Sequence, residues 1–331
     1  MLHASHDFTI QQMNLLEIFR WSTVDVYQSL ANLGVPIFIM LTGALLLQPS
    51  KDESLSAFFK KRWARIGLPI LFWGAAYFVW DFLVEHQAFT SNAIINGILT
   101  GPYYQFWYIY MLIGLYVLTP ILRILVANAE RKILTYFLIL WFLGVSISPL
   151  LGFLTIYHLD NNVLILTGFV GYFILGMYLQ TVRIRRPALL IFVSLGVALT
   201  AFGTYLIATN IGGRHTYFLQ QSLSPTIIFS SVMVFLLLNT FQPPSNINKE
   251  NSSKPQVNRL LKVISQNTLP IFLFHVIVLE SLQRGYFGFA INGNTINSII
   301  GVPLITLITL FICLGVIVPL KKIPVLKKLI G

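Results

Sequence analysis

Charged residues are scarce in this chain. They make up 10% of its 331 residues, whereas apolar residues make up 56%, and the mean hydropathy is +0.76. A soluble domain of this length needs more polar residues than this to cover its surface. The composition therefore excludes a soluble globular protein and predicts an all-α, polytopic helical membrane protein.

Acidic residues are scarcer than basic ones. There are 11 Asp and Glu against 22 Lys and Arg, which gives a net charge of +11. Such an excess would indicate nucleic-acid binding if the cations lay on one soluble surface. Here they lie in short groups between apolar runs, so membrane topology explains them and no nucleic-acid partner is expected.

Cysteine and the common catalytic motifs are also missing. The single cysteine, Cys313, lies inside an apolar run, which excludes disulfides within the chain and cysteine-based metal sites. The sequence has no GxxxxGK(S/T) phosphate loop, no HExxH, no CxxC and no GxSxG motif. We therefore expect neither a metal site nor a tightly bound cofactor.

What the chain does contain is long apolar runs. A helix needs about 20 apolar residues to cross a bilayer, and nine runs approach or exceed that length, of which the first and the seventh are short. Pro36 and Pro270 are expected to bend the first and the eighth. The runs are Asn32–Leu47, Ile66–Val84, Phe106–Val126, Ile133–Leu154, Val163–Gln180, Ala188–Ala208, Pro225–Phe241, Leu260–Leu282 and Ile296–Leu320.

The basic residues alternate along these runs. They follow the first, third, fifth, seventh and ninth runs, and all of the 22 Lys and Arg except Arg20, Arg214 and Arg284 lie on that side. Loops rich in Lys and Arg stay in the cytoplasm. The sequence therefore predicts a multi-pass protein of the plasma or inner membrane with a cytoplasmic C-terminus.

The same alternation places residues 1–31 outside the cell. Met1–Asp7 has neither the basic nor the apolar part of a signal sequence, and one more helix before Met1 would put both termini inside. We therefore expect the natural chain to begin earlier, so that this sequence opens with the end of a truncated first helix. Residues 242–258, rich in Pro, Ser and Asn, are predicted to form a flexible cytoplasmic linker within a single membrane domain, 1–331.

Few ionisable residues fall within the apolar runs. Such a residue is a functional candidate, because burying it in lipid is costly unless it is paired or hydrated. His275 lies in the middle of the eighth run, where a functional role and a hydrogen bond between helices are equally good interpretations. Glu280 follows it, and Asp81 and Glu85 end the second run. His3, taken alone, is most simply a histidine at the membrane interface.

Two further groups have both a structural and a functional interpretation. Arg62 and Arg65 end a basic cluster that anchors the membrane topology, but their spacing also places both guanidinium groups on one helical face. There they can bind one phosphate-bearing ligand. Trp107 and Tyr108 belong to an aromatic run, FWYIY, which is typical of a membrane interface, and stacking on a substrate is the less common role.

Several segments, taken in order, resemble the acyltransferase-3 family of integral membrane proteins. Leu2–Ser5 (LHAS) looks like the end of the family's first helix. Gly34–Leu47 (GVPIFIMLTGALLL) follows it, and Arg62 and Arg65 match the family's Arg-x-x-Arg. Three later segments complete the resemblance: Phe106–Arg123, Gly171–Leu179 and Ser265–His275.

Members of this family typically O-acylate cell-surface sugars and other hydroxyl acceptors. The resemblance therefore implies transfer from a cytoplasmic acyl-CoA, most often acetyl-CoA, to a hydroxyl of a cell-envelope sugar or polysaccharide. It implies that His3 is the catalytic base and that Arg62 and Arg65 bind the phosphates of the donor. The expected partners are acyl-CoA, a glycan or lipid-linked sugar, and membrane lipids. Further substrate-binding candidates are His275, Trp107 and Tyr108.

The sequence departs from the family at one point, and one alternative function stays open. The arginine that members carry ten residues before the histidine would precede Met1. The alternative is an exporter or flippase of a surface polysaccharide, since some relatives of the family have been assigned that role. The basic cluster would then attract an anionic lipid-linked substrate, but transport does not require a histidine beside Arg-x-x-Arg.

Overall fold

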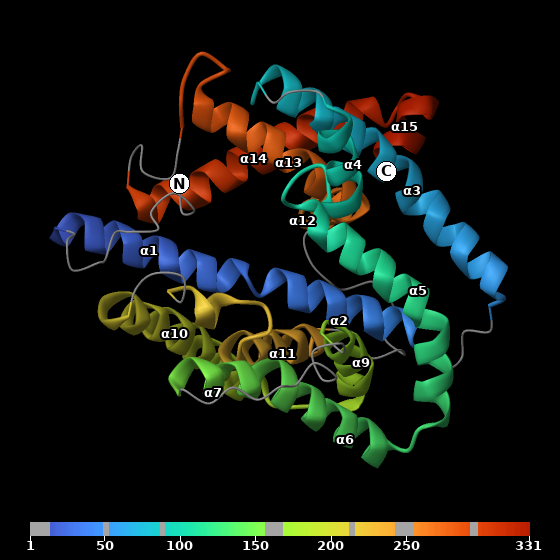
Figure 1. Ribbon diagram of the computed structural model, residues 1–331, viewed down its shortest axis with the longest axis vertical. Coiled ribbons are helices and arrows are strands. Elements are labelled where there is room, and N and C mark those ends of the chain that lie inside the picture. Colours follow the sequence, from blue (N-terminus) through green and yellow to red (C-terminus); the bar gives the residue numbers. More distant parts are fainter. Residues whose placement is uncertain are drawn as a thin grey trace. The chain divides into compact units, whose positions relative to one another are not determined.

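The computed structural model describes residues 14–48, 53–86, 90–155, 168–211, 216–241, 255–291 and 297–331. Within these ranges the chain is helical and contains no strand, which confirms the predicted all-α class (Figure 1). It divides into two compact units. Unit 1 is Met1–Asp52 with Val117–Pro243, and unit 2 is Glu53–Tyr116 with Pro244–Gly331.

The helices are distributed between the units as follows. Helix α5 (Phe106–Asn128) belongs to unit 2 as far as Tyr116 and to unit 1 from Val117. Unit 1 further contains α1 (Leu15–Ala31), α2 (Gly34–Leu46), α6 (Arg131–Phe142), the π-helix η2 (Leu143–Ile147), α7 (Ser148–Leu154), α9 (Val170–Tyr178), the 3-10 turn η3 (Leu179–Thr181), α10 (Arg186–Asn210), the 3-10 turn η5 (Phe218–Gln220) and α11 (Pro225–Asn239). Unit 2 further contains α3 (Leu55–Leu83), α4 (Ser91–Thr100), α12 (Pro255–Gln266), α13 (Thr268–Arg284), α14 (Ser298–Leu320) and α15 (Pro324–Ile330).

Seven helical stretches of the described chain are long and apolar enough to cross a membrane, or eight if α12 and α13 count as one broken span. The chain is therefore a multi-pass membrane protein. The third, sixth and ninth predicted runs coincide closely with α5, α10 and α14. Residues 163–167, which open the fifth predicted run, lie outside the described residues, and α9 covers most of the remainder.

The first spanning stretch is longer than predicted. Helices α1 and α2 together form one candidate span, Leu15–Leu46, which begins well before the predicted Asn32. A capping box starts it, because Asn14 Oδ1 accepts from Glu17 N at 3.0 Å and Glu17 Oε2 accepts from Asn14 N at 2.9 Å. Polar residues such as Asp25 interrupt the apolar pattern, although this carboxyl is buried and accepts a hydrogen bond from another side chain of unit 1.

The eighth predicted span, Leu260–Leu282, is wrong as a continuous helix. The axes of α12 and α13 differ by 79° at a break centred on Asn267. Pro270 is the third residue of α13, where its ring blocks the carbonyl of Gln266 and it has no N–H to donate. The expected bend therefore takes the form of a break, and α12 already begins at Pro255, inside the predicted linker.

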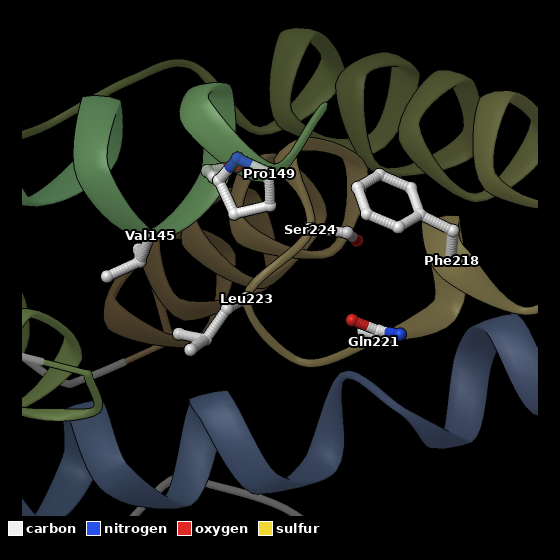
Figure 2. Close-up of a pocket in the computed structure, with 7 residues that line it drawn as sticks. Val145, Pro149, Phe218, Gln221, Leu223 and Ser224 are labelled. Atoms are coloured by element: carbon white, nitrogen blue, oxygen red, sulfur yellow. The ribbon is translucent and has the colours of Figure 1, made fainter. Parts of the chain in front are cut away.

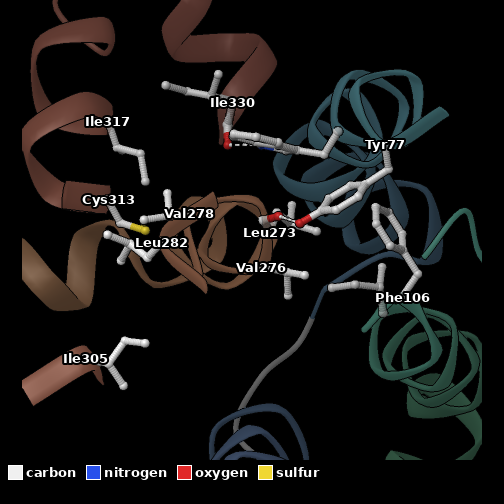
Figure 3. Close-up of a cluster of buried hydrophobic side chains, with 12 residues drawn as sticks. Tyr77, Phe106, Leu273, Val276, Val278, Leu282, Ile305, Cys313, Ile317 and Ile330 are labelled. Carbon is white, nitrogen blue, oxygen red and sulfur yellow. Dashed lines mark hydrogen bonds between the residues drawn. The ribbon is translucent and has the colours of Figure 1, made fainter. Parts of the chain in front are cut away.

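The core of unit 2 joins α3 to α13 and α15 (Figure 3). The Tyr77 hydroxyl donates to the carbonyl oxygen of Leu273 at 2.7 Å, and Trp73 Nε1 donates to that of Ile330 at 3.3 Å. Both tryptophan and tyrosine combine a large apolar surface with one polar group that needs a partner when buried. The first bond fixes α3 beside α13, the helix that carries His275, and the second joins α3 to α15.

Candidate functional site

All of the predicted site residues that the structure describes lie in unit 2. Arg62 and Arg65 are on α3, Trp107 and Tyr108 are on α5, and His275 is on α13. Three helices that are distant in sequence therefore supply one candidate site. His3 lies outside the described residues.

Arg62 is already paired in this structure. Its Nη1 lies 3.1 Å from Glu53 Oε2, and its guanidinium lies 4.0 Å from the centroid of the Phe58 ring. Glu53 also pairs with Lys61 at 2.6 Å. The hydrogen bond from Lys61, together with the charges of both cations, holds the pKa of Glu53 below its usual value, so this carboxylate stays ionised and neutralises part of the basic cluster.

Arg65 makes no hydrogen bond or ion pair with any described residue, and its side chain is exposed. It and Arg62 both lie close enough to the Tyr116 hydroxyl to interact with it electrostatically. The two arginines are therefore directed to one place, as their spacing on a helix predicts. An anion there would meet one free guanidinium, one that is already paired, and a phenolic hydroxyl.

A line of aromatic side chains connects this place to His275. Tyr108 lies two helical turns before Tyr116 on α5, so the two side chains share a similar face of that helix and are close enough for an electrostatic influence. The Tyr108 ring contacts Phe272 with a centroid separation of 5.2 Å, and Phe272 contacts the His275 ring at 5.9 Å. Unit 2 thus brings the arginines, Tyr108 and His275 into one connected set.

The hydrogen bond of His275 fixes its tautomer. Its Nδ1 lies 2.7 Å from the carbonyl oxygen of Phe272, and because a carbonyl can only accept, the proton is on Nδ1. Nε2 makes no hydrogen bond with a described residue and is left as a proton acceptor. Neutral imidazole held in this way has the form required of a general base.

Carboxylates and aromatic rings gather elsewhere in unit 2, near the end of α3. Glu280 of α13 accepts from the Tyr103 hydroxyl at 2.6 Å and from Trp80 Nε1 at 3.1 Å. Burial, with the negative charge of Glu280, raises the pKa of Tyr103 well above its usual range, so its hydroxyl stays protonated and donates. Asp81 and Glu85 lie beside it, and Glu85 pairs with Arg284.

Trp107 contacts the connected set only at its edge. The residue is 44% exposed, and its ring meets that of Tyr108 edge-on, at an interplanar angle of 84°. This exposure is typical of an aromatic residue at the membrane interface. Tyr108, which is half-buried against Phe272, is the better placed of the two for contact with a substrate.

Unit 1 contains a separate pocket of about 240 Å³. Figure 2 shows Pro149 and Val145 on one side and Phe218, Leu223 and Ser224 on the other. Its lining is mostly apolar, and it contains none of the predicted site residues. The candidate chemistry therefore lies with the connected set of unit 2.

The sequence profile of one protein family, described as an acyltransferase domain, matches residues 1–318. The chain belongs to the acyltransferase-3 family. Searches of curated proteins and of solved structures found no significant match. The match covers nearly the whole chain, so this acyltransferase-3 protein is a membrane acyltransferase.

The candidate site contains residues that the sequence did not single out. Tyr116 lies near both arginines and Glu53 pairs with Arg62, whereas Tyr103 and Trp80 belong to the separate group around Glu280. Only Tyr116 had a usable signal, because it follows Tyr108 by eight residues and so lies on a similar face of α5. Tyr103 and Trp80 lack a sequence signal because their partner Glu280 is distant along the chain, and Glu53 lacks one because it precedes the helix, where helical spacing predicts no pairing.

Proposed function

We propose that this acyltransferase transfers an acetyl group from cytoplasmic acetyl-CoA to a hydroxyl of a cell-envelope sugar or polysaccharide. It would do so in the plasma or inner membrane, with its C-terminus in the cytoplasm. The observation that carries the proposal is the connected set of unit 2, in which two arginines, Tyr108 and His275 come together in a chain of the acyltransferase-3 family.

The part of unit 2 that contains Arg62 and Arg65 has the positive charge needed to bind the donor. Coenzyme A carries several phosphate groups, and guanidinium groups bind phosphate through two parallel hydrogen bonds. Because the arginines directly precede the apolar part of α3, on the side where Lys and Arg are concentrated, the positive-inside rule favours the cytoplasmic face for them. The donor would enter there with its thioester directed along Tyr116 and Tyr108.

The chemistry requires a base near the acceptor hydroxyl. The acceptor oxygen attacks the thioester carbonyl while the base takes the hydroxyl proton, the C–S bond breaks, and the thiol leaves with a proton. His3 is the proposed base. His275, with Nε2 unoccupied, would bind the substrate at the point where the line of aromatic residues ends.

The group of acidic and aromatic residues around Glu280 has the chemistry needed to bind a sugar acceptor. Helix α3 has 29 residues and spans roughly 40 Å, so its two ends reach opposite membrane faces. Near its second end, Glu280, Tyr103 and Trp80 form a hydrogen-bonded group. Carboxylates accept hydrogen bonds from sugar hydroxyls, and aromatic rings offer an apolar face with a polar edge.

The direct test compares O-acetyl groups on envelope glycans from cells with and without the gene. Loss of acetylation on an otherwise intact polymer is expected, and restoring the gene should restore it. The measurement is ester-bound acetate per sugar residue in purified glycan. Unchanged acetylation together with loss of surface polymer would contradict the proposal and would favour an exporter or flippase.

The two arginines should differ in their effect on donor binding. Arg65→Gln is expected to raise the KM for acetyl-CoA about tenfold, the equivalent of one lost charge-assisted hydrogen bond. Arg62→Gln should have a smaller effect, because Glu53 already occupies this guanidinium. The measurement is initial-rate kinetics of the purified protein with varied acetyl-CoA.

Lys60→Gln is the matched control, since Lys60 lies in the same cluster and is exposed but does not share the helical face of Arg62 and Arg65. It should leave the KM unchanged. An equal increase for all three variants would mean that the cluster acts only through its total charge, which would contradict a specific phosphate site.

A further inference from the structure

At the break between α12 and α13, one backbone carbonyl lacks its helical hydrogen bond and accepts one from a lysine side chain instead. Because Pro270 has no N–H, the carbonyl oxygen of Gln266 receives no hydrogen bond from the next turn. The ammonium of Lys321, the residue that follows α14, donates to this oxygen at 3.2 Å. An ammonium has three N–H groups, so Lys321 has donors left for another acceptor.

Two more cations lie near Lys321. Burial, followed by the charges of Lys327 and Arg65, lowers the pKa of the Lys321 ammonium. None of these three cations forms an ion pair within the described part of the chain, and Glu53 pairs instead with Lys61 and Arg62. Like charges held together without a counter-charge are unfavourable, and a bound anion would relieve their repulsion.

The amino end of α13 adds polar groups at the same break. Asn267 occupies the N-cap position without capping the helix. Its Nδ2 donates to the carbonyl oxygen of Val263 at 2.7 Å, but its Oδ1 has no partner although the residue is only 6% exposed. Uncapped N–H groups at a helix start attract anions, whereas a free amide oxygen requires a donor. A ligand with both phosphate oxygens and amide or hydroxyl groups would satisfy both.

We propose that Lys321, together with Arg65 and Lys327, binds a phosphate group of the acyl donor at the break between α12 and α13. This inference rests on the proposed function. It extends the donor site from α3 to Lys321, which follows α14, and to Lys327 of α15. The phosphate belongs to acyl-CoA. A lipid phosphate is the competing source of the same chemistry, and the test separates the two.

The test measures KM and kcat of the full-length protein with two donors. Acetyl-CoA carries phosphates, whereas acetyl-pantetheine carries none. Lys321→Gln is expected to raise the KM for acetyl-CoA about tenfold, with kcat within twofold and the KM for acetyl-pantetheine unchanged. The neighbouring exposed Lys322 supplies the matched control, and Lys322→Gln should match the wild type. Equal kinetics for Lys321→Gln and wild type would overturn the proposal.

Vesicle composition separates the two sources of phosphate. The kinetics are repeated in vesicles of phosphatidylcholine alone and in vesicles that also contain phosphatidylglycerol. The donor site requires the same increase in KM in both. An increase confined to the vesicles with phosphatidylglycerol would show that Lys321 binds an anionic lipid, and the donor assignment would fail.

Direct binding of radiolabelled acetyl-CoA separates this inference from the proposed function. Wild-type protein that binds acetyl-CoA, more weakly after Lys321→Gln, but transfers no acetyl group would support the donor site and contradict the function. Lys327→Gln provides a second variant if Lys321→Gln misfolds, since the exposed Lys327 side chain makes no hydrogen bond with a described residue. It should weaken binding about threefold, and unchanged binding would overturn the proposal.

Discussion

Acetyl transfer is expected to fall by about 10²- to 10⁴-fold when His3 is replaced by alanine, while the protein accumulates in the membrane at its normal level. The attacking acceptor is an alcohol, which must lose its proton as the new ester bond forms. A positioned imidazole takes such a proton near neutral pH, and alanine cannot. The measurements are ester-bound acetate on the glycan in cells and initial rates with purified protein.

His6→Ala is the matched control, because it removes an imidazole of the same segment without touching the proposed base. It should retain wild-type acetylation. Full acetylation by His3→Ala would contradict the assignment of His3. If His275→Ala then lost activity, the base would be the imidazole whose Nδ1–H is held by Phe272 and whose Nε2 is unoccupied.

Hydropathy alone was sufficient for the uninterrupted helices. The runs Phe106–Val126 and Ile296–Leu320 predict α5 and α14 closely, because the first has a single charged residue, Arg123 near its end, and the second has none. The start of α1 could not be found in this way. Glu17, Arg20 and Asp25 interrupt the apolar pattern, and only contacts inside unit 1 show how Asp25 is accommodated.

The broken helix was only half predictable. Pro270 indicated a bend, because proline cannot continue the hydrogen-bond pattern of a helix. Its size was not predictable, since it depends on what replaces the missing hydrogen bond. Here Lys321, far along the chain, donates to the Gln266 carbonyl at 3.2 Å.

The candidate site was likewise predictable where it depends on residues close in sequence, but not where it depends on contacts formed by folding. The spacing of Arg62 and Arg65 predicts a shared helical face, and both do reach Tyr116. That Glu53 pairs with Arg62 but not with Arg65 was not predictable, because both arginines are near in sequence to several charged residues. The distinction between a paired and a free guanidinium comes from the folded structure alone.

Replacing Gly43 or Gly176 by valine is expected to destroy the fold of unit 1. These glycines lie where α2 and α9 meet, and both belong to segments on which the family resemblance rests. A Cβ on Gly43 would overlap the carbonyl oxygen of Phe173, and one on Gly176 would overlap that of Met40. Small residues allow such close backbone approach between membrane helices.

The cost of either valine should be about 3 kcal/mol or more, at the upper end of what overpacking causes, because backbone atoms rather than flexible side chains stand in the way. The measurements are the yield of monodisperse protein in detergent and its thermal unfolding temperature. Gly114→Val is the matched control, since nothing lies within 4 Å of a Cβ at this membrane-helix glycine. Equal yield and unfolding temperature for Gly176→Val and Gly114→Val would contradict the close approach of the α2 and α9 backbones.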